Sequence, residues 1–460
     1  MFFKKVHNIY ALKKNEKGIM RYSKNTSWVL GEKILRIVCG LFVGIWVTRY
    51  LGPEQFGLYA YAISFVGIFS AISILGLDTI VVRELVKDET RSDELLGKSF
   101  ILKFLGALGM LIVLSIAVNF TSNNSQTNNL VFIIASATFF HSFNVVDMYF
   151  QSKVLSKYVV YANVISLLMS SIIKIVLILN EAPLIAFAWV VLFDSFVLAS
   201  GFVYFYIINS QRHNKSSILH LLLNAKSSFV WKFNKSTSLS LLKDSLPLAI
   251  SHFAISIYMK VDQVILKDLM NAEAVGQYAA AIRLSEAWYF VPMAIAASLF
   301  PAIINAKKQN KELYNVRLQR LYCFMVWLGI FIALPMTFLS DWVIHFLYGE
   351  QYSQSASVLM IHIWAGVFVF WGVASSRWLI SENLQVFLTI NTCIGAILNI
   401  LLNYILIPKI GIAGAAWATL ISYFVASYLC LLFFKKTRIN FINLTKSIFF
   451  VGVLGVEKKT

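Results

Sequence analysis

The sequence predicts an all-α polytopic membrane protein with about twelve transmembrane helices in two lobes of six. Three observations indicate this: an apolar composition, a series of apolar segments of membrane-spanning length, and a motif that occurs twice. Hydrophobic residues make up 58% of the 460 residues and charged residues 13%, with a mean hydropathy of +0.72. Soluble domains carry about 25% charged residues, so a chain this apolar must be solvated by lipid. The apolar runs are continuous rather than alternating, which argues against a transmembrane β-barrel.

The repeated motif predicts that the chain consists of two related halves. Gly57 and Tyr59 align without a gap with Gly276 and Tyr278, and each copy continues with two alanines and an isoleucine at matching positions. Internal repeats are common in transporters. A chance match between Ala-rich helices is the alternative.

Twelve apolar segments follow one another along the chain. Each is long enough to cross a hydrocarbon core of about 30 Å at 1.5 Å per residue. The expected spans are 28–50, 57–78, 99–119, 129–150, 158–179, 183–208, 246–268, 284–305, 319–339, 355–379, 385–408 and 411–434.

The segments between and around the spans complete the expected organisation. Residues 1–27 form a basic cytoplasmic N-terminus without the apolar core of a signal peptide. Residues 28–208 form the N-terminal lobe and residues 246–434 the C-terminal lobe. Residues 209–245 form a basic cytoplasmic linker between them. The tail 435–460 has an apolar stretch too short to span the membrane, so we expect it to be cytoplasmic or interfacial.

The positive charges predict the orientation of the chain. Of the 40 Lys and Arg residues, 31 fall on the side of the N-terminus, four on the opposite side and five within spans. This asymmetry follows the positive-inside rule and places both termini in the cytoplasm. The net charge of +18 therefore indicates contact with anionic headgroups and does not indicate nucleic-acid binding.

Cationic side chains within or beside the spans are candidates for lining a cavity, because a charge in lipid is costly unless it faces water or a partner. Lys174 and Lys260 lie deepest in their segments. Arg36 has the alternative of pairing with Glu32 four residues before it. Arg49 lies at a helix end and has the alternative of anchoring a loop. Lys33 and Lys103 are expected to reach the membrane surface with their charged ends.

Four acidic residues are candidates for coupling transport to a proton or a sodium ion. They are Asp147, Asp194, Asp262 and Glu286, all within apolar segments. The alternative for Asp262 is a structural hydrogen bond to a neighbouring helix.

The sequence offers no basis for an enzyme or a cofactor site. It contains no complete P-loop, no GxSxG motif, no Rossmann fingerprint and no metal-ligand cluster, and its four cysteines occur singly in apolar runs. A polysaccharide polymerase or ligase would need a large outer loop with catalytic residues, and the expected outer loops are short.

Four motifs together resemble one family of exporters. They are the run Thr48–Tyr59, the stretch Gly76–Glu84, Asp262 with Val275–Tyr278, and Gly411–Ala416. These resemble the Wzx polysaccharide-repeat flippases, members of the multidrug, oligosaccharidyl-lipid and polysaccharide (MOP) exporter superfamily. Arg83 and Asp262 match motif positions of the family, and a structural role is the alternative for both. The resemblance also covers the motif residues Gly57, Tyr59, Gly276 and Tyr278.

The resemblance implies two six-helix lobes with alternating access in the bacterial inner membrane. It also implies a substrate of undecaprenyl diphosphate carrying an O-antigen or capsule unit, and a polymerase and chain-length regulator as pathway partners. Arg36, Arg49, Lys174 and Lys260 would line a shared cationic chamber that attracts the diphosphate. A MATE-type multidrug antiporter of the same superfamily is the alternative, but it should carry an acidic cavity.

Overall fold

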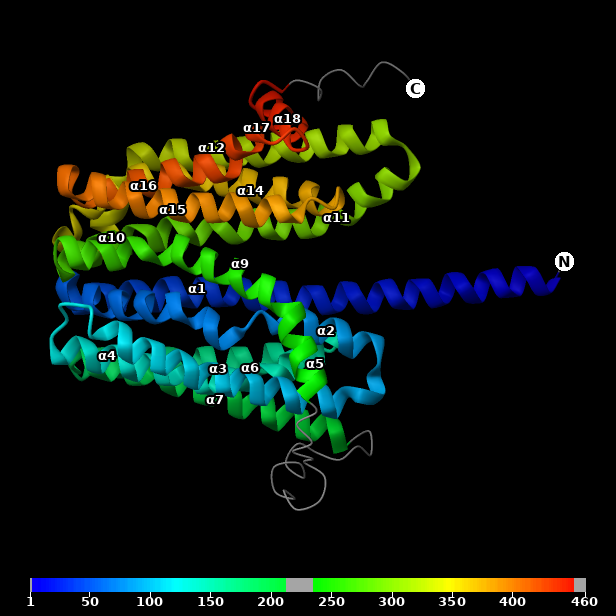
Figure 1. Cartoon of the computed structure of the whole chain (residues 1–460), viewed down its shortest axis with the longest axis horizontal. Coiled ribbons are helices and arrows are strands. Elements are labelled where there is room, and N and C mark those ends of the chain that lie inside the picture. Colours follow the sequence, from blue (N-terminus) through cyan, green and yellow to red (C-terminus); the bar gives the residue numbers. More distant parts are fainter. Residues whose placement is uncertain (1, 212–234, 451–460) are drawn as a thin grey trace. The chain divides into compact units, whose positions relative to one another are not determined.

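The computed structural model describes residues 2–211 and 235–450. Every regular element in these two ranges is a helix (Figure 1), which confirms the all-α prediction. The first element, α1 (Phe2–Ile74), is broken at Gly52, whose φ of 68° and ψ of 171° are not helical. Glycine adopts a positive φ without steric cost, and Pro53 suits the first position of the helix that follows. The expected spans 28–50 and 57–78 lie on either side of this break.

The remaining helices match the predicted segments closely. Several predicted spans consist of consecutive helical pieces, among them 129–150, 284–305, 355–379 and 411–434. The elements are α2 (Leu77–Lys87), η1 (Glu89–Arg91), α3 (Ser92–Val118), α4 (Ser125–Ser136), η2 (Ala137–Asn144), α5 (Val145–Ser152), α6 (Lys157–Leu179), α7 (Leu184–Gln211), α9 (Lys235–Leu269), α10 (Ala272–Glu286), η3 (Ala287–Tyr289), α11 (Phe290–Gln309), α12 (Lys311–Tyr348), η4 (Glu350–Tyr352), α13 (Ser355–His362), α14 (Ala365–Ser381), α15 (Gln385–Ile410), α16 (Ile412–Phe424), η5 (Val425–Leu429), α17 (Cys430–Phe433) and α18 (Arg438–Ile448).

Ten helical stretches in the described part of the chain are long and apolar enough to cross a membrane. The first, Asn25–Lys87, contains two of the expected spans, and α9, which carries the expected span 246–268, is not among the ten. The structure therefore confirms a multi-pass helical membrane protein but does not confirm the count of twelve.

The helices group into two compact units. Unit 1 comprises Met1–Val47 and Phe69–Ile250, and unit 2 comprises Thr48–Ile68 and Ser251–Thr460. The segment Thr48–Ile68, which contains the first copy of the repeated motif, thus belongs with the second copy. The division into lobes 28–208 and 246–434 stays a prediction.

The core of unit 1 is formed by α2, α3, α5, α6 and α7 around fully buried side chains such as Leu77 and Phe150. Gly76 precedes α2 with a φ of 64°, and a Cβ there would lie 2.7 Å from the backbone nitrogen of Ala249. Close approach of α9 thus explains the glycine in the Gly76–Glu84 motif.

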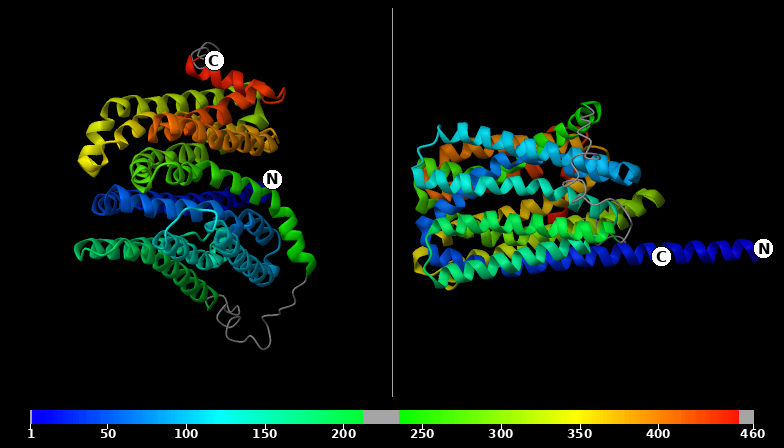
Figure 2. Two further views of the ribbon diagram at one scale, coloured as in Figure 1. Left: turned by 60° about the vertical axis from the view of Figure 1, so that its left-hand side comes forward. Right: turned by 90° about the horizontal axis from the view of Figure 1, so that it is seen from below.

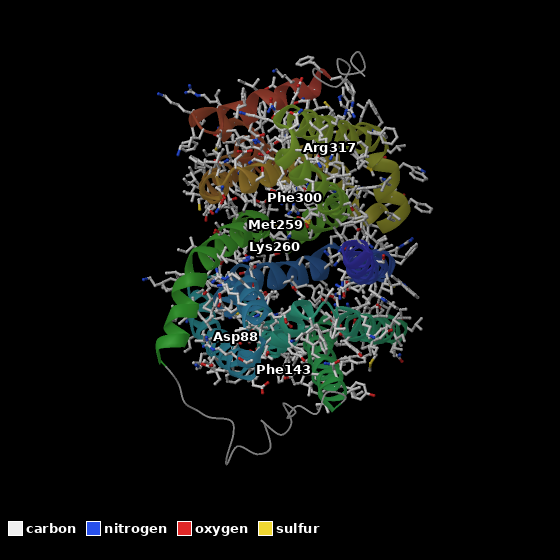
Figure 3. The ribbon with its side chains drawn as sticks, turned by 90° about the vertical axis from the view of Figure 1, so that its right-hand side faces the viewer. Asp88, Phe143, Met259, Lys260, Phe300 and Arg317 are labelled. Atoms are coloured by element: carbon white, nitrogen blue, oxygen red, sulfur yellow. The ribbon has the colours of Figure 1, made fainter. Side chains whose placement is uncertain are left out.

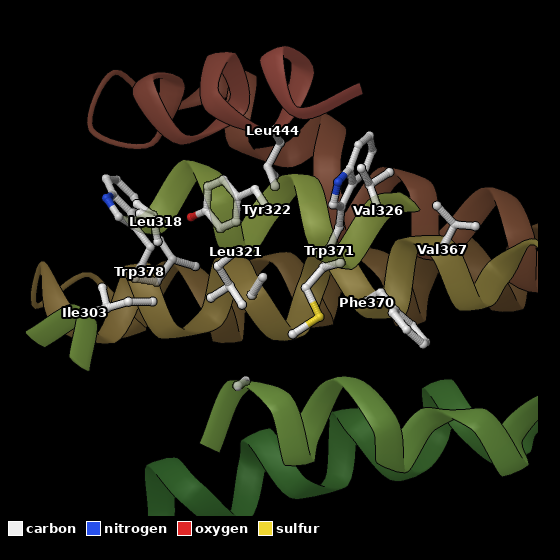
Figure 4. Close-up of a cluster of buried hydrophobic side chains, with 14 of the residues drawn as sticks. Ile303, Leu318, Leu321, Tyr322, Val326, Val367, Phe370, Trp371, Trp378 and Leu444 are labelled. Carbon is white, nitrogen blue, oxygen red and sulfur yellow. The ribbon is translucent and has the colours of Figure 1, made fainter. Parts of the chain in front are cut away.

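The core of unit 2 is formed by α11, α12, α14 and α18 (Figure 4). Tyr322 and Leu444 are fully buried there, together with Phe370 and Trp371. Figure 2 shows α12, α14, α15 and α16 of this unit running side by side. This packing supports the helices that carry the candidate site.

Candidate functional site

Unit 2 contains a cavity of about 300 Å³, lined by both polar and apolar side chains, between the two copies of the repeated motif and α9. This volume is at the lower end of the range for small-molecule sites, about 300–1,000 Å³, so the cavity suits a headgroup better than a whole oligosaccharide. Its lining residues are Phe56, Tyr59, Ala60, Ile63, Ser64, Lys260, Gln263, Ala279, Ile282, Arg283, Glu286 and Ala287.

The cavity is lined by equivalent residues of the two repeats. Three pairs of lining residues are related by the same offset in the sequence that aligns Gly57 with Gly276. They are Ala60 with Ala279, Ile63 with Ile282, and Ser64 with Arg283. The two helices therefore present the same apolar frame, and the second copy adds an arginine where the first has a serine.

The motif glycines allow these two helices to approach each other. A Cβ at Gly57 would lie 1.7 Å from the carbonyl oxygen of Ala272, and a Cβ at Gly276 would lie 1.8 Å from that of Pro53. Pro53 and Ala272 are themselves equivalent positions of the two repeats, so the contact is reciprocal. Both glycines are required because each lets one helix touch the backbone of the other.

Two cations and one carboxylate are among the lining residues. Lys260 projects from α9 (Figure 3), where its Cγ approaches the segment around Gly67. The guanidinium of Arg283 lies 5.3 Å from the ring centre of Phe56 and donates from Nη1 to Thr48 Oγ1 at 3.2 Å. Both cations act electrostatically on Glu286. The excess of positive charge favours an anionic ligand.

Asp262 lies on another face of α9 in a buried hydrogen-bond network. Tyr278 Oη and Thr419 Oγ1 donate to its Oδ2 at 2.6 and 2.5 Å, and Asn403 Nδ2 donates to its Oδ1 at 2.6 Å. Asn403 Nδ2 also lies 3.2 Å from Asn399 Oδ1. Tyr278 is thus the motif residue that connects the second repeat to the carboxylate.

Unit 1 holds Arg36, Lys174, Asp147, Asp194 and Arg83, whereas Arg49 belongs to unit 2. Arg36 Nε donates to Glu32 Oε1 at 2.7 Å, so the arginine forms the ion pair considered as its alternative. Asp194 Oδ1 accepts from Ser166 Oγ at 2.5 Å, and Asp147 Oδ2 accepts from Gln151 Nε2 at 3.0 Å.

Lys174 is half-buried on α6 and, like Arg36, belongs to unit 1. Arg49 is exposed at the end of the first half of α1, and its carbonyl oxygen accepts from Gln351 Nε2 at 2.9 Å. Arg83 is exposed and pairs with Glu84 at 2.9 Å. The shared chamber formed by Arg36, Arg49, Lys174 and Lys260 stays a prediction.

Lys103 corrects a sequence-based expectation. Its side chain is 4% exposed and its Nζ lies 2.6 Å from Asp78 Oδ1, so the charge is paired within unit 1 and does not extend into solvent. Asp78 belongs to the Gly76–Glu84 motif, and this ion pair gives the motif aspartate a structural role.

Arg283 is the site residue that sequence reasoning missed. Its position just before the expected span 284–305 places it among the four cations assigned to the side opposite the N-terminus. The signal that identifies it is the repeat itself, since Arg283 aligns with Ser64 one turn beyond the matching alanines.

Comparison with known proteins agrees with this architecture. The model of the family described as "Polysaccharide biosynthesis protein" matches residues 22–307, and the MatE family model matches residues 247–405. Among curated proteins, the capsular polysaccharide biosynthesis protein CapF of Staphylococcus aureus is 25% identical over 262 residues, covering 51% of this chain and 64% of that protein. The probable low-salt glycan biosynthesis flippase Agl15 of Haloferax volcanii is 25% identical over 240 residues, covering 49% and 50%. The chain therefore spans less than two thirds of the length of these relatives.

Two solved structures share the fold. An inward-facing multidrug resistance MATE family transporter of the MOP superfamily has a TM-score of 0.69 at 16% identity, covering 89% of this chain and 96% of that one. The lipid II flippase MurJ in an inward closed conformation has a TM-score of 0.68 at 16% identity, covering 95% and 93%. The chain therefore belongs to the polysaccharide biosynthesis protein family and has the fold of the MOP exporter superfamily.

Proposed function

We propose that this chain is a flippase that moves an undecaprenyl-diphosphate-linked oligosaccharide across the bacterial inner membrane by alternating access. The observation that carries the proposal is the cavity of unit 2, where Lys260 and Arg283 outnumber the carboxylate of Glu286 among the lining residues. A diphosphate is attracted to such a site, because Lys260 and Arg283 can each donate a charge-assisted hydrogen bond to a phosphate oxygen. Tyr59, Ser64 and Gln263 supply neutral polar groups.

The lipid tail would remain in the bilayer while the cavity shelters the head. Arg36, Arg49 and Lys174 would extend the cationic surface along the path of the substrate. Relatives linked to capsule and glycan biosynthesis support a glycan as the cargo, and the pathway would supply a polymerase and a chain-length regulator as partners. The protein would act without catalysis or a cofactor, with both termini in the cytoplasm.

Asp262 is the best placed of the four acidic candidates to bind a proton or a sodium ion. It is buried, and it is surrounded by neutral oxygen- and nitrogen-bearing side chains from α10, α15 and α16. Glu286, Asp194 and Asp147 are the further candidates. An antiporter of organic cations is the second function to consider, because the MatE family model matches residues 247–405. The excess of positive charge in the cavity disfavours a cationic cargo.

The test is export of surface polysaccharide by cells that carry Lys260→Ala or Arg283→Ala. Loss of one charge-assisted hydrogen bond costs about 1.5–3 kcal/mol, so we expect binding to weaken by roughly ten-fold or more. Lys260→Arg should retain activity, and Lys409→Ala, at the exposed end of α15, is the control. Lys174→Ala tests the extended surface. Unchanged surface glycan in the Lys260 and Arg283 variants, at normal protein level, would contradict the proposal.

A further inference from the structure

The short helix α18 has one face that is fixed to unit 2 by buried polar contacts. Asn440 is fully buried; its Nδ2 donates to Ser375 Oγ on α14 at 2.7 Å, and its Oδ1 accepts from Tyr322 Oη on α12 at 2.5 Å. Gln319 Nε2 on α12 donates to the carbonyl oxygen of Asn443 at 3.1 Å. Leu444 is fully buried in the core cluster (Figure 4). The position of α18 on α12 and α14 is therefore specified by packing and hydrogen bonds.

The opposite face of α18 exposes large apolar side chains. Ile439 is 57% exposed and Ile442 46%, and Phe449 just after the helix is 71% exposed. At 100° per residue, Ile439, Ile442 and Lys446 fall within an arc of about 60°. The apolar face therefore carries a lysine between its isoleucines, whose long stem can cover apolar surface while its charge reaches water.

Exposed cations surround this apolar face. Lys435 and Lys436 precede the helix, Arg438 begins it and Lys446 lies in its last turn. Nε of Arg438 donates to the carbonyl oxygen of Leu432 at 2.9 Å, so this arginine is tied to its own unit while the three exposed lysines project from the surface. Among the described residues Lys435–Ile448 there is no acidic side chain to neutralise them.

The contacts of α18 with Gln319 on α12 and Ser375 on α14 place it about two turns from the start of α12 and the end of α14. Nζ of Lys307 donates to the carbonyl oxygen of Ser381 at 2.6 Å, so the end of α11 and the end of α14 meet there. Tyr314 Oη lies 2.8 Å from Ser381 Oγ, which brings the start of α12 to the same place. With 11 residues and a length of about 16 Å, α18 is too short to cross a bilayer.

We propose that α18 is an interfacial helix that binds the anionic headgroups of the bilayer leaflet at this end of unit 2. Ile439, Ile442 and Phe449 enter the boundary between headgroups and acyl chains. Lys435, Lys436 and Lys446 contact lipid phosphates. Anionic lipid matches the surface because the same face is apolar and positively charged, which is the pattern of helices that lie in the plane of a membrane. The inference does not depend on the cargo of the transporter.

The test places a bimane fluorophore on Ile442→Cys in full-length protein whose native Cys39, Cys323, Cys393 and Cys430 have been replaced. The protein is reconstituted in vesicles, and quenching by brominated phosphatidylglycerol is compared with quenching by brominated phosphatidylcholine. We expect both lipids to quench the probe and the anionic lipid to bind several-fold more tightly, since one cation near an anionic surface contributes on the order of five-fold.

The triple variant Lys435→Gln, Lys436→Gln and Lys446→Gln should bring the ratio of the affinities for phosphatidylglycerol and phosphatidylcholine close to one. The control variant Lys409→Gln, at the exposed end of α15, should leave it unchanged. A probe that brominated lipid does not quench would overturn the proposal, because the face would then lie in water or against protein. Equal binding of the two lipids by the starting protein would overturn the role of the lysines.

Discussion

The reciprocal contact between the two repeats makes a quantitative prediction about stability. In Gly276→Ala, the new Cβ would lie 1.8 Å from the carbonyl oxygen of Pro53 unless the helices separate. Cβ atoms in proteins essentially never approach a neighbour within 3.0 Å, so the backbones must move apart by at least the difference between these two distances. The obstacle is backbone on both sides, and a side-chain rotation cannot relieve it.

We expect this separation to cost about 1–3 kcal/mol, the usual penalty for overpacking. Gly57→Ala should behave alike, because its Cβ would lie 1.7 Å from the carbonyl oxygen of Ala272. Since both changes force the same two helices apart, the double variant should lose less than the sum of the two single losses.

The assay is reversible unfolding of the purified protein in mixed micelles with increasing denaturing detergent. Gly109→Ala is the matched control, because nothing lies within 4 Å of a Cβ at that helical position. Alanine there should stabilise the helix by about 0.5–1 kcal/mol, since it restricts the unfolded chain more than glycine does. If Gly57→Ala and Gly276→Ala gain the same stability as Gly109→Ala, the helices do not cross at these glycines.

Four further predictions concern the Asp262 network, the Lys103–Asp78 pair and the topology. Tyr278→Phe should lower the free energy of unfolding by about 1–3 kcal/mol, because it removes a hydrogen bond to the buried carboxylate of Asp262. Asp262→Asn should abolish transport at a normal protein level, because it removes the proposed ion-coupling carboxylate. Transport by Asp262→Asn at the normal rate would exclude that role. In the same unfolding assay, Asp78→Ala should destabilise the protein by more than Lys103→Met. Lys103 is 4% exposed and Asp78 is 54% exposed, so only Asp78→Ala leaves an unpaired buried charge. A larger loss of stability in Lys103→Met would contradict the buried pair. A cysteine at Asn123, between α3 and α4, should be labelled by an impermeant reagent from outside intact cells, and one at Lys226, which lies outside the described residues, should not; labelling at Lys226 alone would reverse the proposed topology.

The sequence predicts the helical architecture well because apolar length is a local property. Spans such as 158–179 and 385–408 appear as α6 and α15 within a few residues. The predicted boundary between the spans 28–50 and 57–78 coincides with the break at Gly52, but the sequence does not show that helix continues on both sides of this single residue. The repeat at Gly57 and Gly276 was visible in the sequence, but its physical reason, a crossing in which each glycine touches the other helix, requires the structure.

The candidate site shows where sequence reasoning ends. Lys260 was identified by its depth in an apolar segment, and Glu286 by its charge there. Arg283 was missed because it stands just outside an expected span, and the sequence alone does not show that it lines the same cavity as Lys260 and Glu286. Lys103 was misjudged because its partner Asp78 lies on another helix, and no periodicity within one helix reports such a pairing.

The most direct test of the central claim is binding of farnesyl diphosphate, a short and soluble prenyl diphosphate, to the purified protein by isothermal titration. We predict that farnesyl diphosphate binds, that farnesol does not, and that Lys260→Gln and Arg283→Gln each weaken the binding by roughly ten-fold or more. Equal binding of farnesol, or unchanged affinity in both variants, would contradict a cavity that recognises the diphosphate by its two cations.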